Sequence, residues 1–273
     1  MDHKMFILTA ILILAPAVFT PAQAISYGEP DGTTHPNVGS IVVQTTGGTL
    51  YQFCTCTLIS PDVVLTAAHC TESLDEIVAS NPGYQVLVTF DPVITSDSTF
   101  YTGVWHTNPD YNNFVGKHGR ADPGDIAVIV LDQAPGITPA SLPTAGLLDE
   151  LKARHVLYGT HFTAVGYGSV RDTKQTGWQA IEDDNMDRNR VDQEALALTN
   201  AWITLSMNLA TGNGGTCYGD SGGPHFIHLD GVETNIVAAI TVIGDAQCKA
   251  TDQNYRTDTL SARSFLAEYV TLP

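Results

Sequence analysis

The segment Gly219-Asp220-Ser221-Gly222-Gly223-Pro224, late in the chain, decides how the rest of the sequence is interpreted. It surrounds one serine with glycines, which let the backbone turn sharply and approach a substrate closely. A serine hydroxyl is a poor nucleophile near neutral pH, so a neighbouring base must accept its proton during attack. Backbone N–H groups at such a turn can stabilise the oxyanion that forms on the attacked carbonyl. The segment predicts Ser221 as nucleophile, with the N–H groups of Gly219 and Ser221 as oxyanion donors.

Two earlier segments supply the other groups that this chemistry requires. Thr66-Ala67-Ala68-His69-Cys70 offers an imidazole, and Asp125-Ile126-Ala127-Val128 offers a carboxylate directly before an apolar strand pattern. A buried carboxylate beside a histidine holds the ring in the correct tautomer and stabilises the imidazolium. The predicted catalytic residues are therefore His69, Asp125 and Ser221.

With these motifs the chain resembles the trypsin- and chymotrypsin-like serine endopeptidases. TAAHC, DIAV and GDSGGP occur here in the family's order, and the resemblance extends from Ile25 to the C-terminal helix. It implies an all-β fold of two packed six-stranded antiparallel β-barrels with a C-terminal α-helix, and a site in the cleft between the barrels. It also implies hydrolysis of peptide bonds through an acyl-enzyme on Ser221.

The first residues of the chain have the pattern of an export signal. A short polar start with one lysine precedes an apolar run, and Ala22-Gln23-Ala24 forms a small-residue cleavage site, as in a secretory signal peptide. A membrane anchor is less favoured, because the apolar run is shorter than the roughly 20 residues that span a bilayer. The expected parts are a signal peptide at 1–24 and a protease domain at 25–273, with the first barrel at about 25–140, the second at about 141–257 and the helix at about 258–270.

Composition excludes several other classes of protein. The 43% of hydrophobic residues is enough for a buried core, so a mainly disordered chain is excluded. The formal charge of −17 argues against nucleic acid and against a polybasic membrane-surface binder. We expect protein or peptide substrates, no nucleic-acid partner, no membrane association after signal removal, a monomer, and secretion to an extracellular or periplasmic space. The resemblance implies a chemistry that needs no cofactor and no metal.

Short β-rich runs recur between turn signals, which favours a barrel or sandwich. A weak helical pattern covers Val191–Leu198, and a stronger one covers Asp258–Val270, where Asp258 or Thr259 can cap the helix. The polar, charged stretch Lys174–Arg190 is expected to be an exposed loop. The predicted strands are Ser40–Thr45, Asp62–Thr66, Gln85–Phe90, Ile126–Leu131, His161–Tyr167 and Ile236–Ile243.

Five cysteines leave one unpaired or intermolecular in an exported chain. The closely spaced Cys54 and Cys56 do not complete a zinc site, because no second pair of ligands follows at the usual spacing. The family resemblance implies bridges Cys54–Cys70 and Cys217–Cys248. Cys56 is then a free thiol that replaces a family glycine, and its pairing with Cys70 is the alternative.

The start of the mature chain resembles the family's Ile-Val-Gly-Gly terminus. In that family a freed amine pairs with the aspartate before the catalytic serine and orders the oxyanion hole. Here Ile25 follows the predicted cleavage site and Asp220 precedes Ser221. The hypothesis is that signal peptidase itself creates the activating amine at Ile25. The alternative is an amine that stays in solvent.

The substrate pocket departs from the trypsin pattern. The resemblance places Gly215 at the pocket base, where an aspartate would select arginine or lysine, and Val242 and Ile243 on the opposite wall. Branched side chains there favour a small or medium apolar residue before the cleaved bond. Asp252 could supply a carboxylate from another side, which leaves a basic preference open. The predicted pocket residues are Gly215, Thr216, Tyr218, Thr241, Val242 and Ile243.

Two other functions compete with a secreted serine endopeptidase. A catalytically silent binding protein could use the same scaffold, although such proteins usually lose the serine or the histidine. A serine esterase is less favoured, because its nucleophile lies in a Gly-x-Ser-x-Gly elbow with the order serine, acid, histidine.

Overall fold

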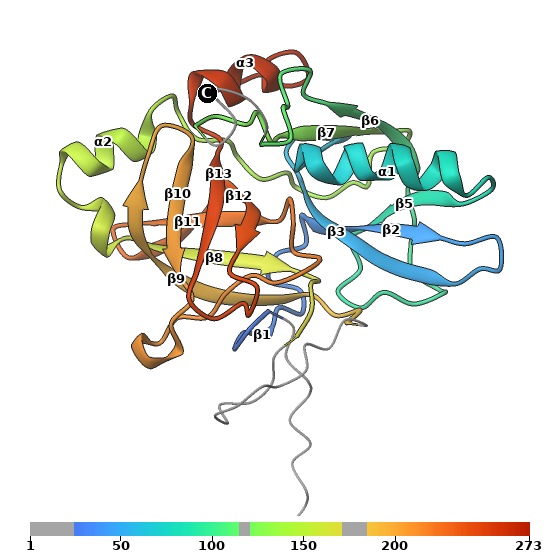
Figure 1. Ribbon diagram of the computed structural model, residues 1–273, viewed down its shortest axis with the longest axis horizontal. Helices are drawn as coiled ribbons and strands as arrows, with labels where there is room; N and C mark the ends of the chain where they lie inside the picture. Colours follow the sequence, from blue (N-terminus) through green and yellow to red (C-terminus); the bar gives the residue numbers. More distant parts are fainter. Residues whose placement is uncertain (1–24, 115–120, 171–184) are drawn as a thin grey trace, which may run out of the picture.

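A computed structural model describes residues 25–114, 121–170 and 185–273. The predicted signal peptide at 1–24 lies outside the described residues, as does most of the loop predicted at Lys174–Arg190. Figure 1 shows two antiparallel β-sheets side by side, with strands β2–β7 on the right and β8–β13 on the left. All six predicted strands are present, with ends that differ by a few residues.

The first sheet has the strand order β5-β2-β3-β4-β7-β6. Val88 of β5 and Tyr101, two residues before β6, exchange N–H···O hydrogen bonds of 2.8 Å in an isolated bridge, so the sheet curls into a half-barrel whose edge strands do not pair along their length. Its strands are β2 (Val38–Gln44), β3 (Leu50–Leu58), β4 (Val63–Thr66), β5 (Gln85–Thr89), β6 (Gly103–Thr107) and β7 (Ala127–Leu131).

The second sheet closes on itself. Its order is β1-β9-β10-β13-β12-β11-β8, and β8 also pairs with β9, so six strands form a barrel with β1 at its side. The prediction of an all-β, trypsin-like pair of barrels is confirmed, with one barrel closed and the other partly open. The strands are β1 (Glu29–Pro30), β8 (His161–Gly166), β9 (Asn189–Leu198), β10 (Trp202–Ser206), β11 (Pro224–Leu229), β12 (Val232–Gly244) and β13 (Thr251–Arg256).

The helix predicted at Val191–Leu198 is wrong, because this segment forms most of β9. Along its first half burial alternates, with Val191, Gln193 and Ala195 buried and Asp192 exposed, which is the period of a strand. Its apolar positions also suit a helix, but pairing with β8 and β10 satisfies its backbone groups.

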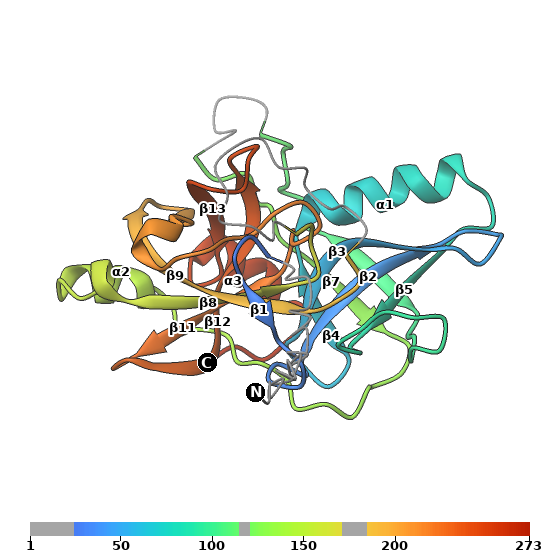
Figure 2. The same ribbon diagram turned by 90° about the horizontal axis from the view of Figure 1, so that it is seen from below.

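The N-terminal residues belong to the second sheet rather than the first. Ser26 forms a bridge with Gly215, and β1 pairs with β9, as Figure 2 shows beside the closed barrel. The described chain therefore starts beside the second barrel and crosses to the first before β2.

Within the described ranges, two α-helices and two short 3₁₀ turns lie between strands, and a third α-helix follows β13. The C-terminal helix is shorter than the expected 258–270, because its cap is Thr259, whose side chain accepts a hydrogen bond from the Ala262 N–H. The Asp258 carboxylate instead accepts from Arg256 and from the Leu148 N–H. The helical elements are α1 (Ala68–Ser80), α2 (Leu147–Ala153), α3 (Leu260–Leu266), η1 (Leu157–Gly159) and η2 (Leu209–Thr211).

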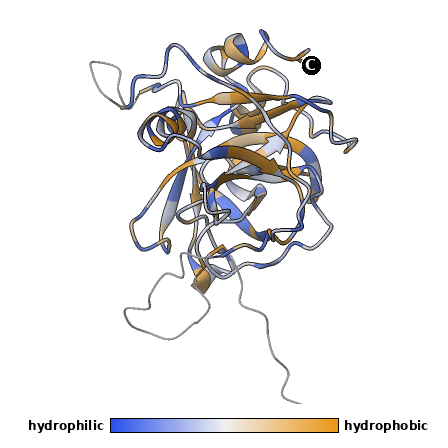
Figure 3. Cartoon of the chain, turned by 90° about the vertical axis from the view of Figure 1, so that its right-hand side faces the viewer, coloured by the Kyte–Doolittle hydropathy of each residue, from blue (hydrophilic) through white to orange (hydrophobic). Residues whose placement is uncertain are grey.

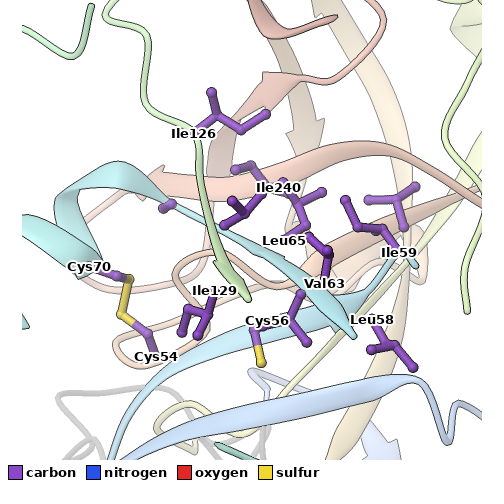
Figure 4. Packing of buried hydrophobic residues seen from close by; sticks show 14 of the residues in the cluster. Cys54, Cys56, Leu58, Ile59, Val63, Leu65, Cys70, Ile126, Ile129 and Ile240 are labelled. Atoms are coloured by element: carbon purple, nitrogen blue, oxygen red, sulfur yellow. A yellow bond between two sulfur atoms is a disulfide. The ribbon is translucent and has the colours of Figure 1, made fainter. Parts of the chain in front are cut away.

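Apolar residues concentrate along the strands, as the orange segments in Figure 3 show. The largest core cluster includes residues of both sheets and of α3. Figure 4 shows Leu65 and Ile129 of the first sheet near Ile240 of β12. This shared core holds the barrels together and so positions the residues between them.

Arg188 is buried, although the sequence predicts an exposed loop at this position. It is 2% exposed, and its guanidinium donates to the Asp31 carboxylate and to the carbonyl oxygens of Val38, Phe90 and Gly32. The prediction of an exposed loop is wrong at this residue, because an arginine with its donors satisfied can be buried.

Candidate active site

The pairing of β4 with β7 brings His69 and Asp125 together. Thr66 pairs with Ala127, so the residues that follow β4 lie beside those that precede β7. Asp125 Oδ2 lies 2.9 Å from His69 Nδ1, and Asp125 Oδ1 accepts the His69 backbone N–H at 2.9 Å. Asp125 is wholly buried, whereas the His69 side chain is 28% exposed. Helix α1 has no side-chain cap, so Asp125 satisfies one of its first N–H groups.

The Ser221 turn lies against this strand–helix junction. The Thr55 N–H donates to the Ser221 carbonyl oxygen at 2.9 Å, and Cys70 Sγ lies 3.7 Å from that oxygen. Gly222 has φ +79°, and a Cβ there would lie 2.1 Å from Thr66 Oγ1. Only glycine allows this approach, which brings the turn next to His69.

Neither of the two N–H groups predicted as oxyanion donors has an acceptor within the described ranges. The Gly219 and Ser221 N–H groups form no hydrogen bond with these residues, and neither does Ser221 Oγ. Gly219 has φ +94°, a backbone conformation that favours glycine. Two unengaged N–H groups on either side of Asp220 can bind an anion.

Asp220 is buried beneath the turn. Its carboxylate accepts the N–H groups of Gly168 and Cys217, each at 2.8 Å. Burial raises the pKa of Asp220 to about 7, although these two hydrogen bonds oppose the shift. In the part of the chain that the structure describes, no cation pairs with Asp220 and no hydrogen bond joins its carboxylate to Ile25. Ile25 is wholly buried against Ala164 and Val191.

A cavity of about 210 Å³ opens beside Ser221. Gly215 does not line this cavity, because the side chain of Met207 occupies the space above it, 2.0 Å from where a Cβ would lie. The sequence patterns gave no signal for Met207. The cavity is lined by Thr216, Cys217, Tyr218, Ser221, Thr241, Val242, Ile243, Gly244, Asp245 and Cys248.

Asp252 lies behind Thr216 and does not line the cavity. It is wholly buried, and its Oδ2 accepts from Thr216 Oγ1 at 2.8 Å and from Gln193 Nε2 at 2.7 Å. Its Oδ1 accepts from Asn254 Nδ2 at 2.8 Å. All three donors are neutral, so they hold the carboxylate in place without cancelling its charge.

A larger cavity of about 570 Å³ lies elsewhere on the second sheet. It is lined by residues that include Tyr27, Thr163, Arg190 and Glu233. None of the predicted catalytic or pocket residues lines it. Of these two cavities, the smaller one is lined by Ser221.

The disulfides pair as the resemblance implies. Cys54 is bonded to Cys70 and Cys217 to Cys248, and Cys56 is a buried free cysteine. Burial raises the pKa of the Cys56 thiol, so it stays protonated and unreactive. The sulfurs of Cys54 and Cys70 lie close to His69, but they are joined to each other and are not thiolate ligands.

The fold is a pair of packed β-barrels, and comparison with known proteins identifies the family of the chain. The sequence matches the family described as Trypsin over residues 29–262, so the chain belongs to the trypsin family, whose members hydrolyse peptide bonds. It is 30% identical to brachyurin from Leptuca pugilator over 175 residues, which cover 63% of this chain and 70% of that protein. The solved structure of HL collagenase superposes with a TM-score of 0.63 at 15% identity, covering 91% of this chain and 100% of that chain. At that identity the superposition shows the fold alone.

Among the residues that the structure describes, no helix has the length and apolar character needed to cross a membrane.

Proposed function

We propose that this chain is a secreted serine endopeptidase that cleaves proteins or peptides through an acyl-enzyme on Ser221. His69 takes the proton of Ser221 and returns it to the leaving amine, while Asp125 orients the ring and stabilises the imidazolium. The N–H groups of Gly219 and Ser221 stabilise the oxyanion. The observation that carries this proposal is the pair of 2.9 Å contacts from Asp125 to His69, beside a serine turn with unengaged N–H groups.

The test is hydrolysis of casein and of a peptide library by the mature protein, with and without a serine-directed inhibitor. Cleavage that Ser221→Ala abolishes in a folded protein supports the proposal. A folded wild-type protein without hydrolysis favours a silent binding protein, and cleavage of esters alone favours an esterase. Unchanged cleavage in the presence of a chelator is expected, because the proposed steps use only protein groups.

The same proposal includes activation by removal of residues 1–24. A free amine on Ile25 would give Asp220 the cationic partner that it otherwise lacks within the described residues. Ser26 pairs with Gly215, two residues before the Cys217 whose N–H binds Asp220, so the new terminus starts close to this carboxylate. Mature protein with one residue added before Ile25 should lose most of its activity. Full activity in that variant would refute the activation pair.

We also propose a small or medium apolar preference at the residue before the cleaved bond. Val242 and Ile243 form an apolar wall of the cavity, and Thr216 separates the cavity from Asp252. A basic side chain could reach Asp252 only if Thr216 moved aside. The peptide library decides between these preferences. Cleavage after lysine or arginine that Asp252→Asn removes would overturn the apolar preference and leave the endopeptidase proposal intact.

Secretion is tested by N-terminal sequencing of the protein recovered outside the producing cell. The expected first residue is Ile25. The two disulfides agree with export, because such bonds persist in oxidising compartments. Sedimentation is expected to show a monomer.

A further inference from the structure

The carbonyl oxygen of Gly219 is held by two donors from the other barrel. Gln52 Nε2 donates to it at 2.8 Å and Thr55 Oγ1 at 3.1 Å, and both residues lie on β3. A Cβ on Gly219 would lie 2.3 Å from Gln52 Oε1, so the amide packs directly on this glycine. A carbonyl oxygen has two lone pairs, and both are used here.

Thr55 also binds the far side of the same turn. Its N–H donates to the Ser221 carbonyl oxygen at 2.9 Å, and its own carbonyl accepts from Thr66 Oγ1 at 3.0 Å. The Tyr167 N–H donates to Thr55 Oγ1 at 3.3 Å, which leaves the threonine proton free to point at Gly219. Thr55 is wholly buried, so water does not compete for these bonds.

We propose that Gln52 and Thr55 are positioning residues that hold the Gly219–Ser221 turn so that the N–H groups of Gly219 and Ser221 point at the developing oxyanion. This inference rests on the proposed function. The peptide that carries the Gly219 carbonyl lies between the two N–H groups, so fixing its oxygen restricts rotation of both. Oxyanion donors stabilise the transition state only when they are oriented before the reaction. Thr55 further links the turn to Thr66 at the end of β4, just before His69.

The effect should fall on the chemical step and leave substrate binding unchanged. Thr55→Val keeps the branched shape and removes the hydroxyl. We expect kcat to fall about tenfold with KM unchanged, a smaller loss than the roughly 10²- to 10³-fold that follows removal of an oxyanion donor itself. Thr55→Ser keeps the donor and should retain most of the rate. Affinity for a peptide boronate, which mimics the tetrahedral state, should fall in parallel with kcat, while affinity for a cleaved peptide product stays the same.

Thr57→Val is the matched control. Thr57 lies on the same strand and is wholly buried, but its hydroxyl has no hydrogen-bond partner among the residues that the structure describes. It should keep the wild-type kcat and boronate affinity. All rates are expressed per active site, counted by titration with a fluorophosphonate, so that a loss of folded protein does not mimic a loss of rate.

Gln52→Met is the second variant, for use if Thr55→Val does not fold, and the same fall in kcat is expected. The inference is overturned if both variants keep the wild-type kcat per active site, even if fewer of their active sites react with the fluorophosphonate. It is also overturned if boronate and product affinities fall together. Wild-type protein that titrates with the phosphonate but cleaves no peptide would instead overturn the proposed function.

Discussion

Replacing Arg188 with methionine should strongly destabilise the fold. The Arg188 side chain is 1% exposed and its ion-pair partner Asp31 is 0% exposed, with Nε 2.8 Å from the carboxylate. The change leaves the carboxylate with His35 as its remaining ionic partner, and it removes the donors to the carbonyls of Val38, Phe90 and Gly32. Breaking a buried ion pair from one side costs about 3–5 kcal/mol, so we expect the free energy of unfolding to fall by about 4 kcal/mol. That is a large part of the roughly 5–15 kcal/mol of a typical domain.

The assay is urea unfolding followed by tryptophan fluorescence, with all proteins in the Ser221→Ala background to prevent self-digestion. Arg190→Met is the matched control, because Arg190 lies two residues further along the chain, in β9, and pairs with an exposed glutamate, Glu29. Such a surface pair is worth at most about 1 kcal/mol. Adding Asp31→Asn to Arg188→Met should restore part of the loss, since no buried charge then lacks its partner. A loss for Arg188→Met no larger than that for Arg190→Met would refute the reasoning.

Three further predictions concern catalysis, the serine turn and pH. Asp125→Asn should lower kcat on a peptide substrate about 10⁴-fold in a folded protein, because no carboxylate then holds the His69 ring in the correct tautomer. A loss below tenfold would contradict this role. Gly222→Ala should abolish activity and destabilise the fold by more than the roughly 1–3 kcal/mol of a strained φ, because the added Cβ would also clash with backbone atoms. The control is Gly212→Ala, at φ +81° with open space around it, which should show the cost of the strained φ alone in urea unfolding. Burial opposes a charge on His35, but the hydrogen bonds that its ring donates to the carboxylates of Asp31 and Glu233 outweigh this effect and raise the pKa of His35. The charged form of His35 therefore stabilises the fold below its ordinary pKa, and this stability is lost as pH rises through the raised value. Glu233→Gln should therefore destabilise the protein more at pH 6 than at higher pH, and a pH-independent difference in urea midpoint would contradict the coupling.

Motifs and strand patterns were the parts of this protein that could be predicted from the sequence. TAAHC, DIAV and GDSGGP each place small residues beside a reactive side chain. The candidate catalytic residues could therefore be identified from short stretches of sequence. Buried strands such as β7 carry a continuous apolar run that needs no partner to be identified. The two disulfides followed from the family resemblance and are present in the structure.

Other features could not be predicted, because they depend on residues far apart in the chain. The β9 segment has apolar positions that suit a helix or a strand, and only its neighbours β8 and β10 decide between them. From the sequence alone, Arg188 is expected to be a solvated charge. In the structure, Asp31 and the carbonyl oxygens of three distant residues surround its guanidinium. No local pattern marks Gln52 or Thr55, whose role arises from contact with a turn in the other barrel.

By itself, the sequence determined which reactive groups the protein carries and, apart from segments such as β9, where strands form, because residue type and short-range periodicity are local properties. The tertiary structure alone decided which of these groups meet. It set the 2.9 Å contacts between His69 and Asp125, and it also placed Met207 above Gly215 and Asp252 behind Thr216. These outcomes depend on strand register and on the packing of two barrels against one shared core, and such long-range contacts leave no signature in any single stretch of the chain.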